Sequence, residues 1–396
     1  MRAFLVALGL LVSAGAEAQS LSEREAVHQA LEATRADEIV ASQLAAERAS
    51  VAVETIVRNP EFAVSHERFL GTRDLREAET ALSIHQEFDL SDWRGRLRDA
   101  LPHQEAALRS ERQEWELEVA HEVRTAFFSV RYHQLRVVVL EGWITRLQSG
   151  VDAAAQREAA GDVSEYDVLR VQRELDTAGA DLASEWSQLN ESWSGLQRWV
   201  PFDSHPDLVG ELTPTQPSGA AAELPSLQRL RHLVAANEAR SGAYGRPGLR
   251  GWSIGGGYLL GRAPDSTAHG FLVELSIPLV VRNNDRAVLD ALAARSDAIE
   301  VELALEGALA DRAQVAARTR LDGSLVALEG LAAPDNDYQL TRMAELAYQA
   351  GEASLTDLLD AYESEAELQL ARVDLQWQAR RAALDLDRTL GRGAIE

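Results

Sequence analysis

The chain has 396 residues, a formal charge of −24 at neutral pH and no cysteine. All of its basic residues are arginines, and the acidic excess argues against nucleic-acid binding, which requires a basic surface. Without cysteine there are no disulfide bonds, so packing alone must stabilise the fold. The acidity has two interpretations: a compositional bias toward Ala, Arg, Asp and Glu, or an acidic channel lumen that favours cations.

The first eighteen residues have the pattern of an export signal. Arg2 supplies the positive start, residues 3–12 form a short apolar run, and residues 16–18 match a small-x-small cleavage site. The apolar run is too short to span a bilayer as a helix. We therefore expect a signal peptide over 1–18, cleaved after Ala18.

The first half of the mature chain, residues 19–200, has the pattern of a helix, two strands, a long helix, a turn and a returning helix. The first helix is predicted over 22–57. Strands are expected at about 60–69 and 81–90, where apolar side chains alternate. The following helix, over 93–160, would be roughly 100 Å long.

A linker separates the two halves. It is predicted at 201–224, because five of the eleven prolines lie within residues 200–225. The second half, residues 225–396, then repeats the order of the first. Residues 160–169 and 350–359 are identical at five of ten positions, at an offset of 190 residues.

The second half shows the same elements more clearly. Strands are expected at about 251–260 and 270–281, with a polar loop over 261–265 between them. Residues 285–350 have a helical pattern that is broken at Pro334. The last helix presents apolar side chains at coiled-coil spacing: Leu355, Leu359, Tyr362, Ala366 and Val373.

The repeated turn has a local structural explanation. Gly161 and Gly351 suit the left-handed position that ends a long helix. A serine three residues later suits the N-cap of the returning helix, with an aspartate three residues further on as an acidic capping box. These pairs are Ser164 with Asp167 and Ser354 with Asp357.

Each predicted strand is about ten residues long, which is the length needed to cross a bilayer at a tilt. One face is apolar and the other is small or polar, as in transmembrane barrels. The same pattern also fits two soluble hairpins whose apolar faces pack on helices. Four strands cannot close a barrel, since the smallest membrane barrels have about eight. A membrane location would therefore require several copies of the chain.

Several ordered motifs resemble the TolC-like outer membrane efflux proteins. They are the two turn segments, VELSIPL at 273–279 with RNN at 282–284, and FDLS at 88–91. The resemblance covers nearly all of the mature chain. It implies a mainly α fold with a β-barrel part, in which a homotrimer forms a twelve-stranded outer-membrane barrel on a long periplasmic helical tunnel. The SIPL and RNN run is most similar to the heavy-metal, CzcC-like branch.

The resemblance also implies a function and partners. The chain would be the outer-membrane subunit of a tripartite efflux system, passively conducting cargo from a periplasmic adaptor (membrane fusion) protein and an inner-membrane pump. It would sit in outer-membrane lipid, with metal cations as a candidate cargo. Two alternatives remain: the exit duct of a type I protein secretion system, and a periplasmic coiled-coil scaffold that never enters the membrane.

We predict that the two turns are the contact points for the adaptor. In the family that the chain resembles, acidic residues of the second repeat line the closed periplasmic entrance. Carried over, these gate candidates are Asp357 and Asp360. Asp360 is the better one, because capping already explains Asp357. The first repeat has Arg170 at the position equivalent to Asp360.

No arrangement typical of catalysis or metal binding accompanies these motifs. The nine histidines form no ligand set. The acidic and histidine residues within 118–122 are interpreted as a solvated helix face, and His66 and His85 fall on opposite faces of the first hairpin. Residues 255–257, three glycines, lie inside a strand pattern and are not a phosphate loop. We expect no enzyme activity, no cofactor and no metal site.

Overall fold

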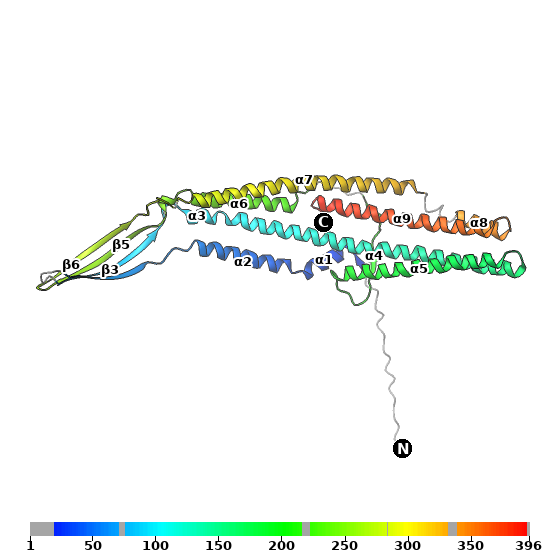
Figure 1. Cartoon of the computed structure of the whole chain (residues 1–396), viewed down its shortest axis with the longest axis horizontal. Helices are drawn as coiled ribbons and strands as arrows, with labels where there is room; N and C mark the ends of the chain where they lie inside the picture. Colours follow the sequence, from blue (N-terminus) through cyan, green and yellow to red (C-terminus); the bar gives the residue numbers. More distant parts are fainter. Residues whose placement is uncertain (1–19, 71–75, 216–221, 283, 332–338, 394–396) are drawn as a thin grey trace, which may run out of the picture. The chain divides into compact units, whose positions relative to one another are not determined.

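Helices dominate the computed structural model, and the longer strands form one four-stranded sheet (Figure 1). The structure describes residues 20–70, 76–215, 222–282, 284–331 and 339–393. The predicted export signal and the predicted break at Pro334 lie outside these residues. No helix within the described ranges has a stretch long and apolar enough to cross a membrane.

The chain divides into two compact units, and each draws on both halves of the sequence. The strand unit holds residues 36–115 and 223–311, and the turn unit holds the remainder. The strand unit contains α2 (Ala36–Glu54), β2 (Glu61–Leu70), β3 (Arg76–Phe88), α3 (Trp93–Arg98), α6 (Pro225–Tyr244), the short 3-10 helix η1 (Pro247–Leu249), β5 (Trp252–Ala263) and β6 (Ser266–Ser276). The turn unit contains β1 (Ser20–Ser22), α1 (Glu23–Ala33), α5 (Glu165–Gln197), β4 (Asp207–Val209), α8 (Gln339–Gln349) and α9 (Leu355–Thr389).

Two long helices, α4 (Leu101–Ala160) and α7 (Arg286–Gly330), contribute residues to both units. With 60 residues, α4 is about 90 Å long. The helix expected over 22–57 is divided into α1 and α2 at Arg35, which has a φ of 50°. The helix expected from residue 93 is likewise divided, into α3 and α4.

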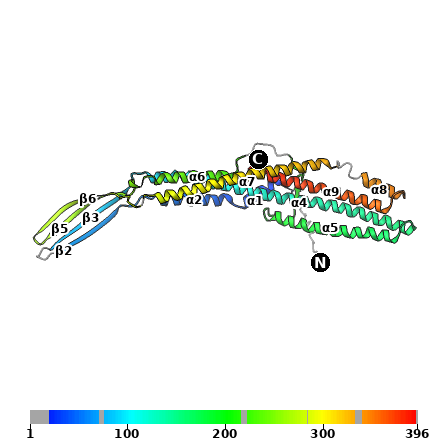
Figure 2. The ribbon, with the colours of Figure 1, turned by 45° about the horizontal axis from the view of Figure 1, so that its top comes forward.

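The large sheet has the order β2-β3-β5-β6, with every neighbouring pair antiparallel (Figure 2). The two hairpins therefore pair through β3 and β5, so the two halves of the sequence form one sheet. The polar loop expected at 261–265 is shorter, because β5 continues to Ala263 and β6 begins at Ser266. β6 ends at Ser276, before the expected end at 281. Pro278 follows, and it has no backbone N–H for a neighbouring strand.

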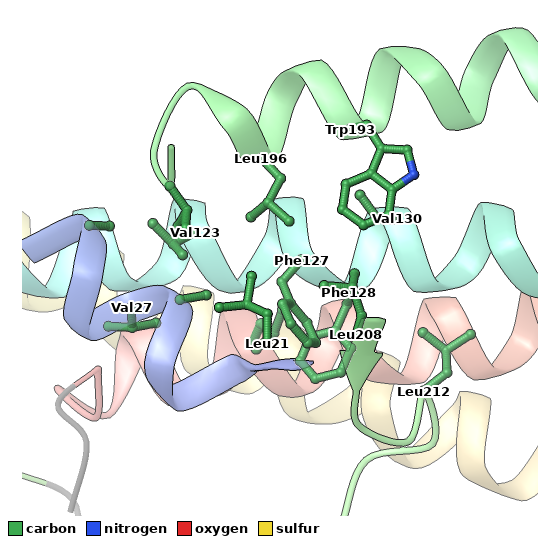
Figure 3. Close-up of a cluster of buried hydrophobic side chains, with 14 of the residues drawn as sticks. Leu21, Val27, Val123, Phe127, Phe128, Val130, Trp193, Leu196, Leu208 and Leu212 are labelled. Carbon is green, nitrogen blue, oxygen red and sulfur yellow. The ribbon is translucent and has the colours of Figure 1, made fainter. Parts of the chain in front are cut away.

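The core of the turn unit lies along α4 (Figure 3). Its fully buried residues recur every three or four positions and include Val123, Phe127 and Val130. They pack with Trp193 and Leu196 of α5. Burying each such side chain contributes about 1.5–3 kcal/mol, so this stripe fixes α5 against α4.

A second cluster joins the helices near the repeated turns. Leu147 and Ala154 of α4 and Val171 of α5 pack there with residues of α9. The five residues of α9 predicted at coiled-coil spacing are all buried. This packing holds the ends of α4, α5 and α9 together within the turn unit.

Candidate functional site: the strand face and the paired helix turns

One face of the large sheet is apolar and exposed. The register places Phe62 beside Ile84, Leu82 beside Tyr258, and Tyr258 beside Phe271, all on the same face. A soluble sheet would cover such a face, yet Phe271 is 88% exposed and Phe62 64%. The alternative in which the apolar faces pack on helices is therefore wrong for the described chain.

The opposite face is polar and more enclosed. His85, Gly255 and Glu274 form one row across β3, β5 and β6. His85 Nδ1 lies 3.9 Å from Glu274 Oε2, and its Nε2 lies 2.8 Å from the hydroxyl of the buried Ser83. The His85 ring occupies the space where a Cβ on Gly255 would stand. Gly255 therefore allows the close packing of the His85 ring against β5.

The turn after α4 ends that helix at Gly161, whose φ is +84°. The N–H of Gly161 donates to the carbonyl of Glu158 at 2.9 Å, and that of Asp162 donates to the carbonyl of Arg157 at 2.8 Å. This pair of bonds is a Schellman motif. The left-handed glycine expected here is present.

Ser164 then caps α5. Its side chain accepts from the N–H of Asp167 at 3.3 Å, and its own N–H donates to Asp167 Oδ2 at 3.0 Å. This is the predicted acidic capping box.

The turn after α8 repeats this geometry in the second half of the sequence. Gly351 has a φ of +77°, and its N–H donates to the carbonyl of Tyr348 at 3.0 Å. Ser354 caps α9, because its side chain accepts from the N–H of Asp357 at 3.2 Å while its N–H donates to Asp357 Oδ2 at 2.9 Å. The internal repeat therefore extends to individual hydrogen bonds.

The capping bonds also set the charge of the two aspartates. Hydrogen bonds from the hydroxyl and then the N–H of Ser164 lower the pKa of Asp167, and the same bonds from Ser354 lower the pKa of Asp357. Both carboxylates are therefore charged at neutral pH, where they complement the positive end of the helix dipole.

The two turns lie side by side at one end of the turn unit, as both views show (Figures 1 and 2). Arg157 Nη1 donates to the carbonyl of Tyr348 at 3.3 Å, and Arg170 Nη1 donates to Thr356 Oγ1 at 3.1 Å. A groove of about 550 Å³ runs between the turns, lined by Arg157, Tyr348 and both N-cap serines. The hydroxyl of the buried Tyr348 has no hydrogen-bond partner among the described residues.

Asp360 lies on the exposed side of α9, one turn beyond Asp357. Leu358 and Leu359 between them are buried, so the two aspartates face away from the core of the turn unit. Among the described residues, Asp360 has no ion-pair or hydrogen-bond partner.

Two histidine predictions have different outcomes. His66 pairs with Thr80 on the apolar face. It therefore lies on the opposite face of the sheet from His85, as expected. The solvated face predicted within 118–122 holds for Glu122, which is exposed, but is wrong for His121, whose Nε2 lies 3.7 Å from Asp385 of α9. Burial against α9 lowers the pKa of His121.

The contacts of Arg157 with Tyr348 are not evident from the sequence. The residues around each turn can be recognised from the repeat, but nothing in the repeat indicates that the two turns touch. The Arg157 guanidinium also lies over the Tyr348 ring, and this cation–π contact depends on how the repeats pack.

A family model described as "Outer membrane efflux protein" matches residues 62–200. No curated protein matches the sequence. Three solved structures with the same fold are the outer-membrane channel OprN, the open state of the MtrE outer membrane channel of Neisseria gonorrhoeae, and CusC. OprN is 19% identical with a TM-score of 0.71, over 93% of this chain and 89% of that chain. MtrE is 18% identical with a TM-score of 0.67, over 94% and 89%, and CusC is 16% identical with a TM-score of 0.69, over 93% and 91%.

The family match spans the first hairpin, α4, the first turn and α5. The second half repeats this order and its turn geometry, and the fold of the solved channels covers more than nine-tenths of the chain. The resemblance to TolC-like proteins is thus confirmed, while the heavy-metal branch stays a prediction. Residues 62–200 therefore match the outer membrane efflux protein family, and the chain as a whole has the fold of the solved outer-membrane channels.

Proposed function

We propose that the chain is the outer-membrane subunit of a tripartite efflux system, which conducts cargo passively across the outer membrane. The observation that carries this proposal is the exposed apolar face of the large sheet. Such a face is unfavourable in water and favourable in lipid. The polar row of His85 and Glu274 would then face the lumen.

Closure of the sheet requires more than one copy. In the described chain β2 and β6 are the edge strands, and each pairs on one side only. Unpaired strand edges cannot persist in lipid, so the β6 edge of one copy would pair with the β2 edge of the next. Three copies of this four-stranded sheet make a twelve-stranded barrel.

The helices support the same assembly. Exposed apolar side chains recur at four-residue intervals on α7, where Val301, Leu305 and Leu309 are more than half exposed. Neighbouring copies in a trimer would cover this stripe and form a tunnel of packed helices.

The paired turns would be the docking site for the periplasmic adaptor protein. The groove between them offers a partner the side chains of Arg157 and of the two N-cap serines, which can supply charge and hydrogen bonds. Docking involves the turn residues Gly161, Ser164, Asp167, Gly351 and Ser354.

Asp360 is the proposed gate residue, with Asp357 mainly a cap. Three exposed Asp360 carboxylates near a trimer axis would repel one another or hold a divalent cation. The cap hydrogen bonds of Asp357 leave less of its carboxylate available for this role.

Metal cations are the proposed cargo, on the strength of the resemblance to the heavy-metal branch and the charge of −24. An inner-membrane pump would supply the energy, since a duct of this kind has no catalytic machinery. Among the alternatives, the scaffold is disfavoured by the exposed apolar sheet. A secretion duct would share the fold and differ in its partners.

Fractionation of the producing cells tests this proposal. The mature chain should begin at Gln19 by mass spectrometry and sediment with outer membranes on a sucrose gradient. Its release should require detergent. A chain that is soluble without detergent would support the scaffold instead.

A further inference from the structure

We propose that the strand unit binds the phosphate group of an anionic membrane phospholipid through Arg246 and Arg282, where the apolar sheet face ends. This inference rests on the proposed membrane location and adds a specific lipid contact to it.

The exposed apolar stripe of β6 continues beyond the end of that strand. Alternate residues from Phe271 to Val281 are apolar and exposed, with Val273 at 80% and Leu279 at 84%. The next residue is Arg282, which is also exposed. The stripe thus changes from apolar to cationic within one residue, which is the order expected where hydrocarbon gives way to headgroups.

The loop before β5 carries a second arginine, Arg246, close to the segment that contains Arg282. Trp252, the first residue of β5, pairs with Phe88 on the apolar face, and its indole donates to the carbonyl of Gly248 at 3.0 Å. A Cβ on Gly248 would lie 3.7 Å from Val280. The loop that carries Arg246 therefore lies against the segment that carries Arg282. The paired aromatic side chains of Phe88 and Trp252, at the end of the apolar face, match the aromatic girdle that flanks the apolar band of membrane barrels.

Charge identifies the ligand as an anion. Other arginines nearby have acidic partners, since Arg250 pairs with Asp285 and Arg58 lies 3.3 Å from Glu87. In the described part of the chain, Arg246 and Arg282 have no acidic partner, although the chain as a whole carries −24. A guanidinium group matches the geometry of phosphate oxygens, and the apolar stripe above it offers a surface for the acyl chains.

Native mass spectrometry of the full chain in detergent, with equal amounts of phosphatidylglycerol and phosphatidylcholine, tests the site. The parent should retain phosphatidylglycerol in preference. Arg246→Gln and Arg282→Gln should each weaken that retention about fivefold, from the usual attraction of one arginine to an anionic surface. Arg295→Gln, at an exposed arginine of α7, is the matched control and should behave as the parent.

Three results would overturn the site. The parent could retain both lipids equally, or the Arg282→Gln variant could retain phosphatidylglycerol as well as Arg295→Gln does. Loss of the trimer in Arg282→Gln would instead assign this arginine to contacts between copies. A conducting trimer without lipid preference would remove the lipid site and leave the proposed function standing. A chain soluble without detergent would contradict the proposed function itself.

Discussion

Arg157 and Tyr348 join the two repeats of the chain at their turns. The guanidinium carbon of Arg157 lies 4.7 Å from the centre of the Tyr348 ring, and the same group donates a hydrogen bond to the Tyr348 carbonyl. Each residue lies within four positions of a left-handed glycine, Gly161 or Gly351. The contact therefore holds the two turns in one arrangement.

Arg157→Gln should loosen this arrangement. The loss of a cation–π contact and a hydrogen bond should cost about 1–2 kcal/mol. Hydrogen exchange should become faster in peptides covering both turns. Arg173→Gln, at an exposed arginine of α5, is the control and should leave exchange unchanged. Equal exchange in the two variants would show that the contact does not hold the turns together.

Valine at either turn glycine should weaken adaptor docking. Gly161 and Gly351 have φ values of +84° and +77°, and a β-branched residue is strained there by about 1–3 kcal/mol. Crosslinking to the adaptor should fall in both variants. Gly179→Val provides the control, because Gly179 lies within α5 with open space at its Cβ. If all three variants crosslink like the parent, the turns are not the docking site.

The three glycines of β5 should differ in their tolerance of alanine. A Cβ on Gly257 would lie 2.6 Å from the carbonyl oxygen of Leu82, whereas a Cβ on Gly256 would meet nothing within 4 Å. Gly257→Ala should therefore destabilise the sheet by about 1–3 kcal/mol and lower the melting temperature of the assembly. Gly256→Ala should melt with the parent. Equal melting of the two variants would contradict the register of β3 and β5.

The turns could be predicted from sequence because their chemistry is local. A glycine, a serine and an aspartate at fixed spacing determine the left-handed end of one helix and the cap of the next, and the repeat supplied two copies. The one-sided apolar pattern of the strands was equally visible. Both features require only the order of residues along the chain.

Register and contacts between repeats could not be predicted in this way. Aligning the aromatic residues suggests that Phe62 pairs with Phe88, but it pairs with Ile84. β3 extends back to Arg76, which shortens the connection and shifts the register by four residues. The shift is even, so the face of each side chain was still predicted correctly. The face of His121 could not be inferred, since it depends on the position of α9.

The variants Asp360→Ala and Asp357→Ala should have different effects, because Asp360 is the proposed gate residue and Asp357 is mainly a helix cap. If three Asp360 carboxylates bind a divalent cation at a constriction, removing them should raise single-channel conductance or relieve block by millimolar divalent cation. Asp357→Ala should instead loosen the first turn of α9, with less effect on conductance. The cap requires the charged Asp357 carboxylate, and the pKa of this group is lowered in the folded chain. The cap is therefore fully formed above pH 3.8, the ordinary pKa of aspartate, and is lost as the pH falls through the lowered pKa.

Planar-bilayer recordings of both variants, with and without the cation, make this comparison. An Asp360→Ala channel with the conductance and cation block of the parent would return Asp360 to an ordinary exposed helix position.

In the proposed assembly, the four-stranded sheet closes only when three copies of the chain associate in a membrane. The most direct test of this assembly is the mass of the particle purified in detergent, combined with single-channel recording of the same sample. Three chains per particle and a stable conductance are expected. A monomer that keeps its strand content by circular dichroism, and that forms no channel, would contradict the proposed trimeric channel.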